Sequence, residues 1–347
     1  MLILGHEEVR AALEGRESSV VAAVRDAYRQ HASGRTAVPH SVFLRFPGDN
    51  RNRIIALPAY LGRDDGHEPG VAGMKWVASF PGNHEHGMPR ASAVMVINSM
   101  RTGRPEAVLE GSLISAQRTA ASAALAASVL SGDSPDRAVA VVGCGVINLE
   151  IVRFLRATLP GLRTVALFDV DEARRRAFAE QCAKSWPDLA VETVTSAEEA
   201  LRRHPLISIA TTAAQPYLGT AGCGPGTLIL HISLRDLTAE AIMNSDNVVD
   251  DVDHVCREQT SVHLAEQQTG HRRFISGTIG ELLSDGGYGG GGHSGGAHGH
   301  RSTSRSTSKV TVFSPFGLGV LDLAVAELVR QWAISNGVGT EVPDFAA

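Results

Sequence analysis

The segment Ala138-Val-Ala-Val-Val-Gly143-Cys-Gly145-Val-Ile-Asn148 constrains the fold of this chain more than any other. An apolar β-like run enters a tight glycine turn, and a helix-like stretch over 147–159 follows. Strands that alternate with helices form a parallel, doubly wound sheet. We therefore predict an α/β chain with a Rossmann-type domain. Its further β-like runs are 164–168, 191–194, 206–210, 227–232 and 247–249.

The same glycine turn predicts a dinucleotide site. Gly143 permits the turn, Gly145 lets the backbone approach a pyrophosphate, and the N–H groups of the next helix hold the negative charge. Asn148 stands where the fingerprint usually has its third glycine, which weakens the motif taken alone. Asp169 ends the next β-like run and can accept both ribose hydroxyls while repelling a 2′-phosphate.

We therefore expect NAD as the cofactor. NADP remains an alternative because three arginines follow in the next helix, Arg174, Arg175 and Arg176. The residues expected to bind the cofactor are Gly143, Gly145, Val146, Ile147, Asn148, Asp169, Thr211 and Ser233.

The rest of the chain has a different pattern. Before residue 115, helical spacing is followed by β-like runs joined by tight turns, which favours an antiparallel or mixed sheet. A small-residue helix over 113–130 leads out of this region, and an amphipathic helix over 318–332 ends the pattern. We expect residues 1–118 and 312–347 to form one α+β domain, with the Rossmann domain, 119–311, inserted into it.

Composition limits the classes of function. A net charge of −5 and a pI near 6.3 offer no basic stripe to nucleic acid. Four widely spaced cysteines form no CxxC pair, which argues against a disulfide framework or a structural zinc site. The N-terminus turns acidic at once, unlike a signal peptide, and the near-apolar stretch 119–130 is too short to span a bilayer. We expect a cytoplasmic protein with neither nucleic-acid nor membrane partners.

Histidine clusters offer weak metal signals. Residues 285–308 are rich in glycine, histidine and serine, and we expect a flexible surface excursion there. Three histidines in it could bind a metal, but glycine spacers hold no fixed geometry; these are His293, His298 and His300. His84 and His86 lie in a Pro/Gly loop and are expected at the surface. We expect no metal site.

Three charged residues stand among apolar neighbours, where burial requires a partner or a ligand. Arg118 suits a carboxylate because its guanidinium binds two oxygens at once. Lys75 can neutralise a carboxylate or, with a lowered pKa, move a proton. Asp236 follows the fifth β-like run of the parallel sheet and can hold an amine or activate a water. An edge-strand lysine, a snorkelling arginine and a helix N-cap aspartate remain the structural alternatives.

Three runs in order around the glycine turn resemble the ornithine cyclodeaminase/μ-crystallin family: Ala72–Asn83, Ser115–Ser122 and Thr311–Asp322. The resemblance covers nearly the whole chain outside the Gly/His tract. It is strongest to the branch that makes 2,3-diaminopropionate for siderophores and peptide antibiotics, on Met74-Lys-Trp, Gly143–Asn148, His231–Asp236 and Ser314–Gly317. The resemblance implies a homodimer whose N-terminal domain, completed by the C-terminal tail, binds substrate and dimerises, while the Rossmann domain delivers NAD.

The resemblance also implies roles for single residues. Lys75 and Arg118 match the family's substrate-carboxylate positions, and Asp236 matches its catalytic aspartate. His40 stands where other members place an arginine, so a further cation has to come from Arg45, Arg53 or Arg90. We expect Arg53 and Arg90 to bind substrate, although Arg90 can also be structural.

These implications favour one substrate, N-((2S)-2-amino-2-carboxyethyl)-L-glutamate, whose three carboxylates fit a cation-rich pocket. The run Arg53–Pro58 lacks the glutamate that cyclodeaminases tend to have there. We expect NAD-dependent oxidative C–N cleavage to 2,3-diaminopropionate and 2-oxoglutarate, with NADH formed. The alternatives are ornithine cyclodeamination, imino-acid reduction or alanine-type dehydrogenation, and a non-enzymatic binding protein of the μ-crystallin kind.

Overall fold

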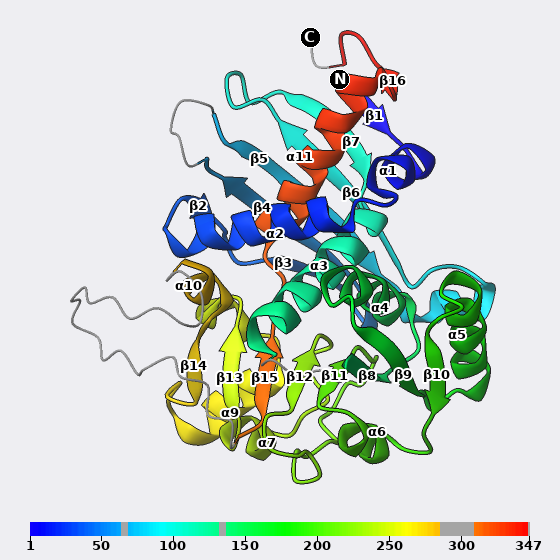
Figure 1. Ribbon diagram of the computed structural model, residues 1–347. Helices are drawn as coiled ribbons and strands as arrows, with labels where there is room; N and C mark the ends of the chain where they lie inside the picture. Colours follow the sequence, from blue (N-terminus) through cyan, green and yellow to red (C-terminus); the bar gives the residue numbers. More distant parts are fainter. Residues whose placement is uncertain (64–68, 132–136, 285–308, 346–347) are drawn as a thin grey trace. The chain divides into compact units, whose positions relative to one another are not determined.

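The computed structural model describes residues 1–63, 69–131, 137–284 and 309–345 (Figure 1). The chain divides into two compact units, each described here by itself. Unit 1 is Met1–Ala121 with Gly317–Ala347, and unit 2 is Ser122–Phe316. The Gly/His-rich tract expected at 285–308 lies outside the described residues.

Unit 1 is built on a mixed sheet of eight strands among the described residues, in the order β16-β1-β7-β6-β5-β4-β2, with β3 paired to β4. Strands β3 to β7 pair antiparallel, as the tight turns predicted, whereas β1 joins β7 in parallel. The elements of unit 1 are β1 Leu2–Leu4, α1 His6–Leu13, α2 Glu17–Ala32, β2 Thr36–Ala37, β3 Val42–Phe46, β4 Asp49–Leu61, β5 Val71–Ser79, the 3-10 helix Pro81–His86, β6 Ala91–Asn98, β7 Pro105–Glu110, α11 Gly319–Asn336 and β16 Thr340–Glu341.

One face of this sheet forms the core of unit 1. Helix α11 packs against α2 and against β4, β5 and β6, so the C-terminal helix completes the N-terminal unit (Figure 1). Alternate residues of the strands point to this face, and Lys75 is among them, between the cross-strand neighbours Leu57 and Met95. Lys75 is only 2% exposed, so the strand register alone buries a charge in an apolar layer.

The opposite face of the same sheet is apolar but only partly covered. Across it, Val42 of β3, Ala56 of β4, Trp76 of β5 and Val94 of β6 stand side by side. Val42 is 64% exposed, Trp76 is 40% exposed, and Leu44 beside them is 46% exposed. We call this the open face, defined by Val42, Leu44, Ala56, Trp76 and Val94.

Unit 2 contains the expected parallel sheet, with described strands in the order β10-β9-β8-β11-β12-β15-β13-β14 (Figure 1). All of its strand pairs are parallel, and apolar β-branched residues fill its central strands. The elements of unit 2 are β8 Arg137–Val142, α4 Val146–Thr158, β9 Leu162–Phe168, α5 Glu172–Ser185, β10 Ala190–Thr193, α6 Ala197–Arg203, β11 Leu206–Ile209, β12 Leu228–His231, α7 Ala239–Met243, β13 Asp246–Val249, α8 Val252–Val255, α9 Ser261–Thr269, β14 Ile275–Thr278, α10 Ile279–Ser284 and β15 Thr311–Ser314.

Strand β15 moves the expected domain boundary. Thr311–Ser314 lies between β12 and β13 inside the parallel sheet, whereas the sequence analysis divided this segment after residue 311. Unit 2 therefore extends to Phe316. The run Thr311-Val-Phe-Ser is fully buried, as a central parallel strand requires.

Helix α3, Ser112–Leu130, contains the boundary between the units, since unit 1 ends at Ala121. Among the described residues it is the one helix that is long and apolar enough to cross a membrane by length and composition. Two thirds of its apolar window, 67%, is buried inside the protein, as in the core helix of a folded domain. This is weak evidence for a membrane span.

Candidate functional site

The glycine turn after β8 has the geometry that its sequence predicts. Gly143 has φ +95°, and a Cβ there would lie 2.4 Å from the carbonyl oxygen of Ala210, so the strand end requires a glycine. Gly145 is the N-cap of α4, and a Cβ on it would meet no described atom within 4 Å. The first turn of α4 is open, with Val146 65% exposed. Backbone N–H groups at this helix end are suited to a phosphate.

Asn148 fastens this turn. Its side-chain amide donates to the carbonyls of Val142 (3.0 Å) and Gly143 (2.7 Å), and its oxygen accepts from the Ser208 hydroxyl (2.7 Å). Asn148 is fully buried. The residue at the position of the third glycine therefore connects β8, the turn and β11 by hydrogen bonds.

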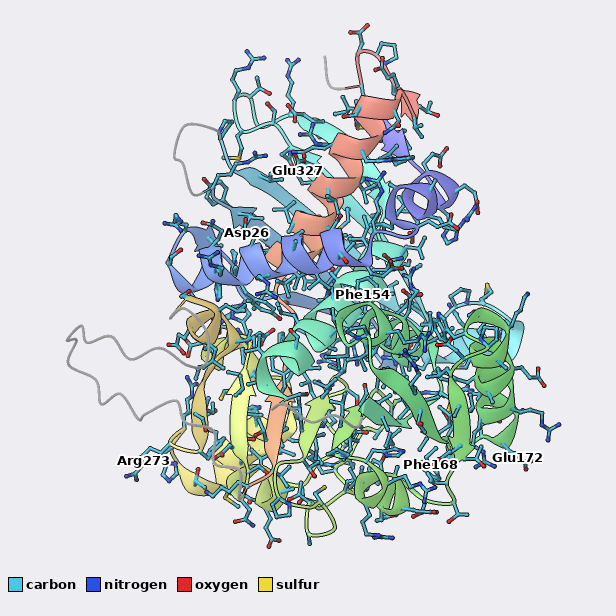
Figure 2. The ribbon with its side chains drawn as sticks, in the orientation of Figure 1. Asp26, Phe154, Phe168, Glu172, Arg273 and Glu327 are labelled. Carbon is cyan, nitrogen blue, oxygen red and sulfur yellow. The ribbon has the colours of Figure 1, made fainter. Side chains whose placement is uncertain are left out.

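Asp169 stands just beyond Phe168, the last residue of β9, which Figure 2 labels. One carboxylate oxygen accepts from the backbone N–H of Cys144 in the glycine turn (2.7 Å), and the other accepts from that of Asp171 (2.9 Å). Each oxygen keeps a further lone pair, so the carboxylate can still accept ribose hydroxyls. NADP was kept as an alternative cofactor because of three arginines in the next helix. Two of them form ion pairs within their own segment, Arg174 with Asp171 and Arg176 with Glu172.

Asp236 lies at the centre of a buried hydrogen-bond network. The hydroxyls of Thr211 and Ser233 donate to its two carboxylate oxygens, and His231 Nε2 lies 3.4 Å from Oδ2. Burial alone would raise the pKa of Asp236, but these hydrogen bonds outweigh it, and the pKa lies below its usual value. Ser314 Oγ lies 3.4 Å from the other ring nitrogen of His231.

These side chains all follow strands at the carboxyl edge of the parallel sheet. The strand order reverses between β8 and β11, and open α/β sheets bind ligands at such a point. Gly143 follows β8 and Thr211 follows β11, while Ser233 and Asp236 follow β12. The loop after β12 is strained, because Leu234 is a non-glycine residue at φ +66°.

Asp236 itself has no exposed surface. The sequence predicts that this carboxylate holds an amine or activates a water, which would require direct access to the bound molecule. Thr211 and Ser233 are both partly exposed, but Thr211 Oγ1 already accepts from the Ala213 N–H (3.0 Å). The Ser233 hydroxyl is therefore the member of this network best able to reach a bound molecule.

Unit 1 brings Lys75 and Arg118 together on a third residue, Asp322 of α11. Lys75 Nζ donates to Asp322 Oδ2 (2.7 Å), and Arg118 Nε donates to Oδ1 (2.9 Å). Lys75 Nζ also donates to the Ser115 hydroxyl (3.1 Å). Asp322 has no exposed surface, and the Arg118 side chain is 12% exposed. One buried carboxylate thus fixes two cations.

Burial lowers the pKa of Lys75 to about 8, an effect that Asp322 opposes and Arg118 reinforces. Burial would raise the pKa of Asp322, but the nearby charges of Arg118 and Lys75 outweigh this effect. The pKa of Asp322 therefore lies below its usual value, and the carboxylate is ionised. One anion therefore faces Arg118, which stays charged, and Lys75, which is charged below pH about 8; this excess of positive charge favours a bound carboxylate.

Gly317 makes room for Arg118. It has φ +93°, and a Cβ there would lie 2.7 Å from Arg118 Nη1. The glycine of the Ser314-Pro-Phe-Gly317 run therefore lets the guanidinium lie against the backbone at the start of α11.

Arg53 and Arg90 lie further along the same face of the sheet as Lys75. Arg53 pairs across the strands with Ser79, which is four residues from Lys75 along β5. Arg90 Nε lies 3.4 Å from Ser79 Oγ. Arg45 is the cross-strand neighbour of Arg53 and lies over the Phe43 ring. Arg53 and Arg90 are thus both neighbours of Ser79, four residues along β5 from Lys75.

Several residues of these networks were not predicted. Asp322, Ser115 and His231 stood inside the quoted family runs without a role. A signal for Asp322 was present, because a carboxylate in the apolar helix Gly319–Ala326 needs a buried partner. In the part of the chain that the structure describes, no group of three or more His, Cys, Asp or Glu residues is arranged to hold a metal.

The chain belongs to the ornithine cyclodeaminase/mu-crystallin family, whose sequence profile matches residues 3–337. This confirms the family predicted from the sequence.

Three known proteins illustrate the relationship. The alanine dehydrogenase of Archaeoglobus fulgidus is 29% identical over 99% of this chain and 98% of its own length. The N-((2S)-2-amino-2-carboxyethyl)-L-glutamate dehydrogenase of Staphylococcus aureus is 25% identical over 98% of this chain and 97% of its own. A solved archaeal alanine dehydrogenase, a dimer with bound NAD, superposes with a TM-score of 0.82 at 27% identity over 99% of both chains. The predicted fold class is confirmed. The relatives are dehydrogenases, one of them with bound NAD, in agreement with the predicted enzyme class and the predicted cofactor.

Proposed function

We propose that this protein is an NAD-dependent oxidoreductase that oxidises the C–N bond of N-((2S)-2-amino-2-carboxyethyl)-L-glutamate. The products are 2,3-diaminopropionate, 2-oxoglutarate and NADH. The dehydrogenases among its relatives support the reaction class. The observation that carries the choice of substrate is the row of cations on one face of the unit 1 sheet.

This row matches a substrate with several separated carboxylates. Lys75 and Arg118 form one end. At the other end, Arg53 is the cross-strand neighbour of Ser79, and Arg90 Nε lies 3.4 Å from Ser79 Oγ. Four residues of extended strand separate Lys75 from Ser79, a distance of about 13 Å that long arginine side chains can shorten. Alanine has a single carboxylate and needs one end only, whereas three carboxylates occupy both ends.

The residues of unit 2 fit NAD. A Cβ would fill the turn at Gly143, the start of α4 is open, and Asp169 is held at the end of β9 with lone pairs to spare. Asn148 and Thr211 keep the turn and its neighbouring strand end in place. NAD, when bound, accepts hydride from the substrate carbon that carries the nitrogen.

The resulting carbon–nitrogen double bond has to take up water before the two products separate. We assign the orientation of this water to the hydroxyl of Ser233, which donates to the buried Asp236. The anionic carboxylate turns the hydroxyl hydrogen inward, so the outward-facing oxygen accepts a hydrogen bond from the water. Asp236 thereby acts on the reaction without contacting solvent.

The first experiment is to mix the protein with NAD and N-((2S)-2-amino-2-carboxyethyl)-L-glutamate and to follow NADH absorbance. Alanine and ornithine are tested in parallel, and 2-oxoglutarate is quantified. NADH and 2-oxoglutarate from the first substrate alone support the proposal. NADH from alanine alone would reject it in favour of the second candidate, alanine-type dehydrogenation, which the 29% identity to an alanine dehydrogenase favours.

Arg118→Ala tests the substrate site directly. Removing a charged hydrogen-bonding group from a carboxylate should raise KM and lower kcat/KM by about 10²-fold or more, since such contacts are worth about 2–5 kcal/mol. Arg90→Ala should raise KM for the tricarboxylate and leave alanine binding unchanged. Unaltered kinetics in Arg118→Ala would remove that residue from the site.

We also propose that the protein is a homodimer, with a second copy covering the open face of unit 1. Exposed Val42, Leu44 and Trp76 form an apolar patch on a sheet, which is a typical dimer surface. The related archaeal dimer supports this assembly. Trp76→Glu should halve the mass measured by light scattering, and an unchanged mass would exclude this face.

We place the reaction in the cytoplasm, where NAD is available. All four cysteines are free thiols, as expected in a reducing compartment.

A further inference from the structure

In the Lys75–Asp322–Arg118 group, carboxylate binding alone does not explain why residue 75 is a lysine and not an arginine. Only three of the 32 lysine and arginine residues of this chain are lysines, and they are Lys75, Lys184 and Lys309. Lys184 and Lys309 are exposed. The only buried lysine therefore stands where an arginine would bind a carboxylate with two parallel hydrogen bonds. An amine can lose its proton near neutral pH, and a guanidinium cannot.

The contacts of Lys75 leave one position open on its nitrogen. A protonated amine has three N–H donors in tetrahedral directions. Two are occupied, by Asp322 Oδ2 at 2.7 Å and by Ser115 Oγ at 3.1 Å. Both of these donors remain when the amine is neutral, and the lone pair then takes the third direction. Asp322 and Ser115 thus determine which way a proton can enter or leave.

Asp322 gives its two oxygens to different partners. Oδ2 takes Lys75, and Oδ1 takes Arg118 Nε, so the two cations are held beside each other by one rigid carboxylate. Arg118 keeps its charge and has its terminal nitrogens against Gly317. The charged groups that face Lys75 are Asp322 of α11 and Arg118 of α3.

We propose that Asp322 is a positioning residue that orients the Lys75 amine to take a proton from the bound amino acid, while Arg118 binds the carboxylate. This proposal rests on the proposed function and deepens it. The nitrogen of the bound substrate is a secondary ammonium, and its Cα can release hydride only after that nitrogen has a lone pair.

The proton balance is complete with this assignment. The substrate R₂CH–NH₂⁺–R′ passes one proton to the neutral Lys75 amine, which becomes NH₃⁺. Hydride transfer to NAD then leaves R₂C=NH⁺–R′, and water addition gives R₂C=O and R′–NH₃⁺. One proton is released overall, and it leaves from the Lys75 ammonium when the neutral amine is regenerated. The oxidant is the NAD of the proposed function.

The experiment measures the ionisation of Lys75 without requiring turnover. Because the chain has three lysines, protein labelled with ¹³C at lysine Cε gives three resonances, which Lys184→Arg and Lys309→Arg assign. We expect the Lys75 resonance to titrate with a pKa near 8. Asp322→Asn should lower this pKa by about one unit or more, and Arg118→Gln should raise it, because one variant removes a neighbouring anion and the other a neighbouring cation.

Glu327→Gln is the matched control. Glu327 is a buried carboxylate on the same helix, labelled in Figure 2, but it pairs with Arg330 and Gln331. It should leave the Lys75 pKa unchanged. If Asp322→Asn does not fold, Asp322→Glu replaces it: this variant keeps the charge but moves the carboxylate, so the Lys75 pKa should shift if the Asp322 contact orients the amine. A Lys75 pKa that moves in neither variant, or moves equally in Glu327→Gln, overturns the proposal.

A kinetic arm separates this proposal from the proposed function. With wild-type protein and NAD, kcat/KM should rise with pH through the Lys75 pKa, and Asp322→Asn should shift that rise to lower pH. An active wild type whose pH profile is unmoved by Asp322→Asn refutes the positioning role and leaves the proposed function intact. A wild type that forms no NADH from any of the three substrates refutes the proposed function, while the ¹³C titration still decides the role of Asp322.

Discussion

Each unit has its own buried network centred on an aspartate with no exposed surface, and the two carboxylates are stabilised in different ways. Asp322 in unit 1 lies on a helix and pairs with two cations. Asp236 in unit 2 lies in a loop and accepts hydrogen bonds from two hydroxyls, with an imidazole nearby. An ion pair in the interior needs both signs of charge, whereas a hydrogen-bonded carboxylate needs only donors. The site in unit 1 therefore depends on charge balance, and the network in unit 2 depends on local hydroxyl geometry.

The largest expected effect is that of removing the shared anion. Asp322→Ala leaves Lys75 and Arg118 as like charges without a partner, and breaking a buried pair costs about 3–5 kcal/mol. Guanidinium chloride unfolding of the variant and wild type measures the difference. A loss below about 1 kcal/mol would show that water or bound anions replace the carboxylate, and the contrast between the units would then be wrong.

The next largest expected effect is a dependence of the free energy of unfolding on pH that comes from Lys75. The folded protein releases this proton near pH 8, whereas the unfolded chain keeps it to about pH 10.4, so the unfolded state binds more protons between these values. The Lys75 contribution to stability therefore rises with pH in this window, by at most about 3 kcal/mol. Unfolding of wild type and Lys75→Met at pH 7.5 and pH 10 gives the difference. A wild type that gains nothing relative to Lys75→Met contradicts the expectation.

Asp236→Asn should cost less stability, because one hydroxyl can still donate to the amide oxygen and the Ser233 oxygen can turn to accept from the amide nitrogen. We expect a loss of about 1–2 kcal/mol, together with a fall in kcat of about 10²–10⁴-fold and little change in NAD affinity. Ser233→Ala should reproduce most of the loss in kcat while retaining the buried carboxylate. Full activity in Ser233→Ala would instead show that Asp236 reaches the bound molecule by another route.

The smallest expected effect on stability is that of Gly145→Ala, one of two glycine substitutions in the turn that should differ in their cost. Gly143→Ala introduces a clash with Ala210 at positive φ and should cost about 1–3 kcal/mol, whereas Gly145→Ala meets no described atom and should cost less than about 0.5 kcal/mol. Both variants should weaken NADH binding in a fluorescence titration by about tenfold or more. Gly143→Ala distorts the turn, and the added methyl group of Gly145→Ala faces the expected position of the pyrophosphate. Unchanged affinity in Gly145→Ala would place the cofactor elsewhere.

Much of the fold could be read from local patterns. The predicted β-like runs 164–168 and 206–210 correspond to β9 and β11, and the predicted helix 113–130 corresponds to α3. Strands β1, β2 and β16 were not predicted, because two or three residues carry no periodicity. The segment Thr311–Ser314 was read as part of a motif, since only the pairing of β15 with β12 and β13 reveals it as a central strand.

The sequence by itself determined the α/β class, the glycine turn, the family, and Lys75, Arg118 and Asp236 as charges that need partners. These follow from local spacing and from the free-energy cost of burying a charge, which depend on residue type alone. Only the tertiary structure showed that Asp322, 247 residues beyond Lys75, joins Lys75 to Arg118, and that Asp236 is enclosed by Thr211 and Ser233. Which partner a buried charge receives depends on how distant segments pack, and no local pattern records that choice.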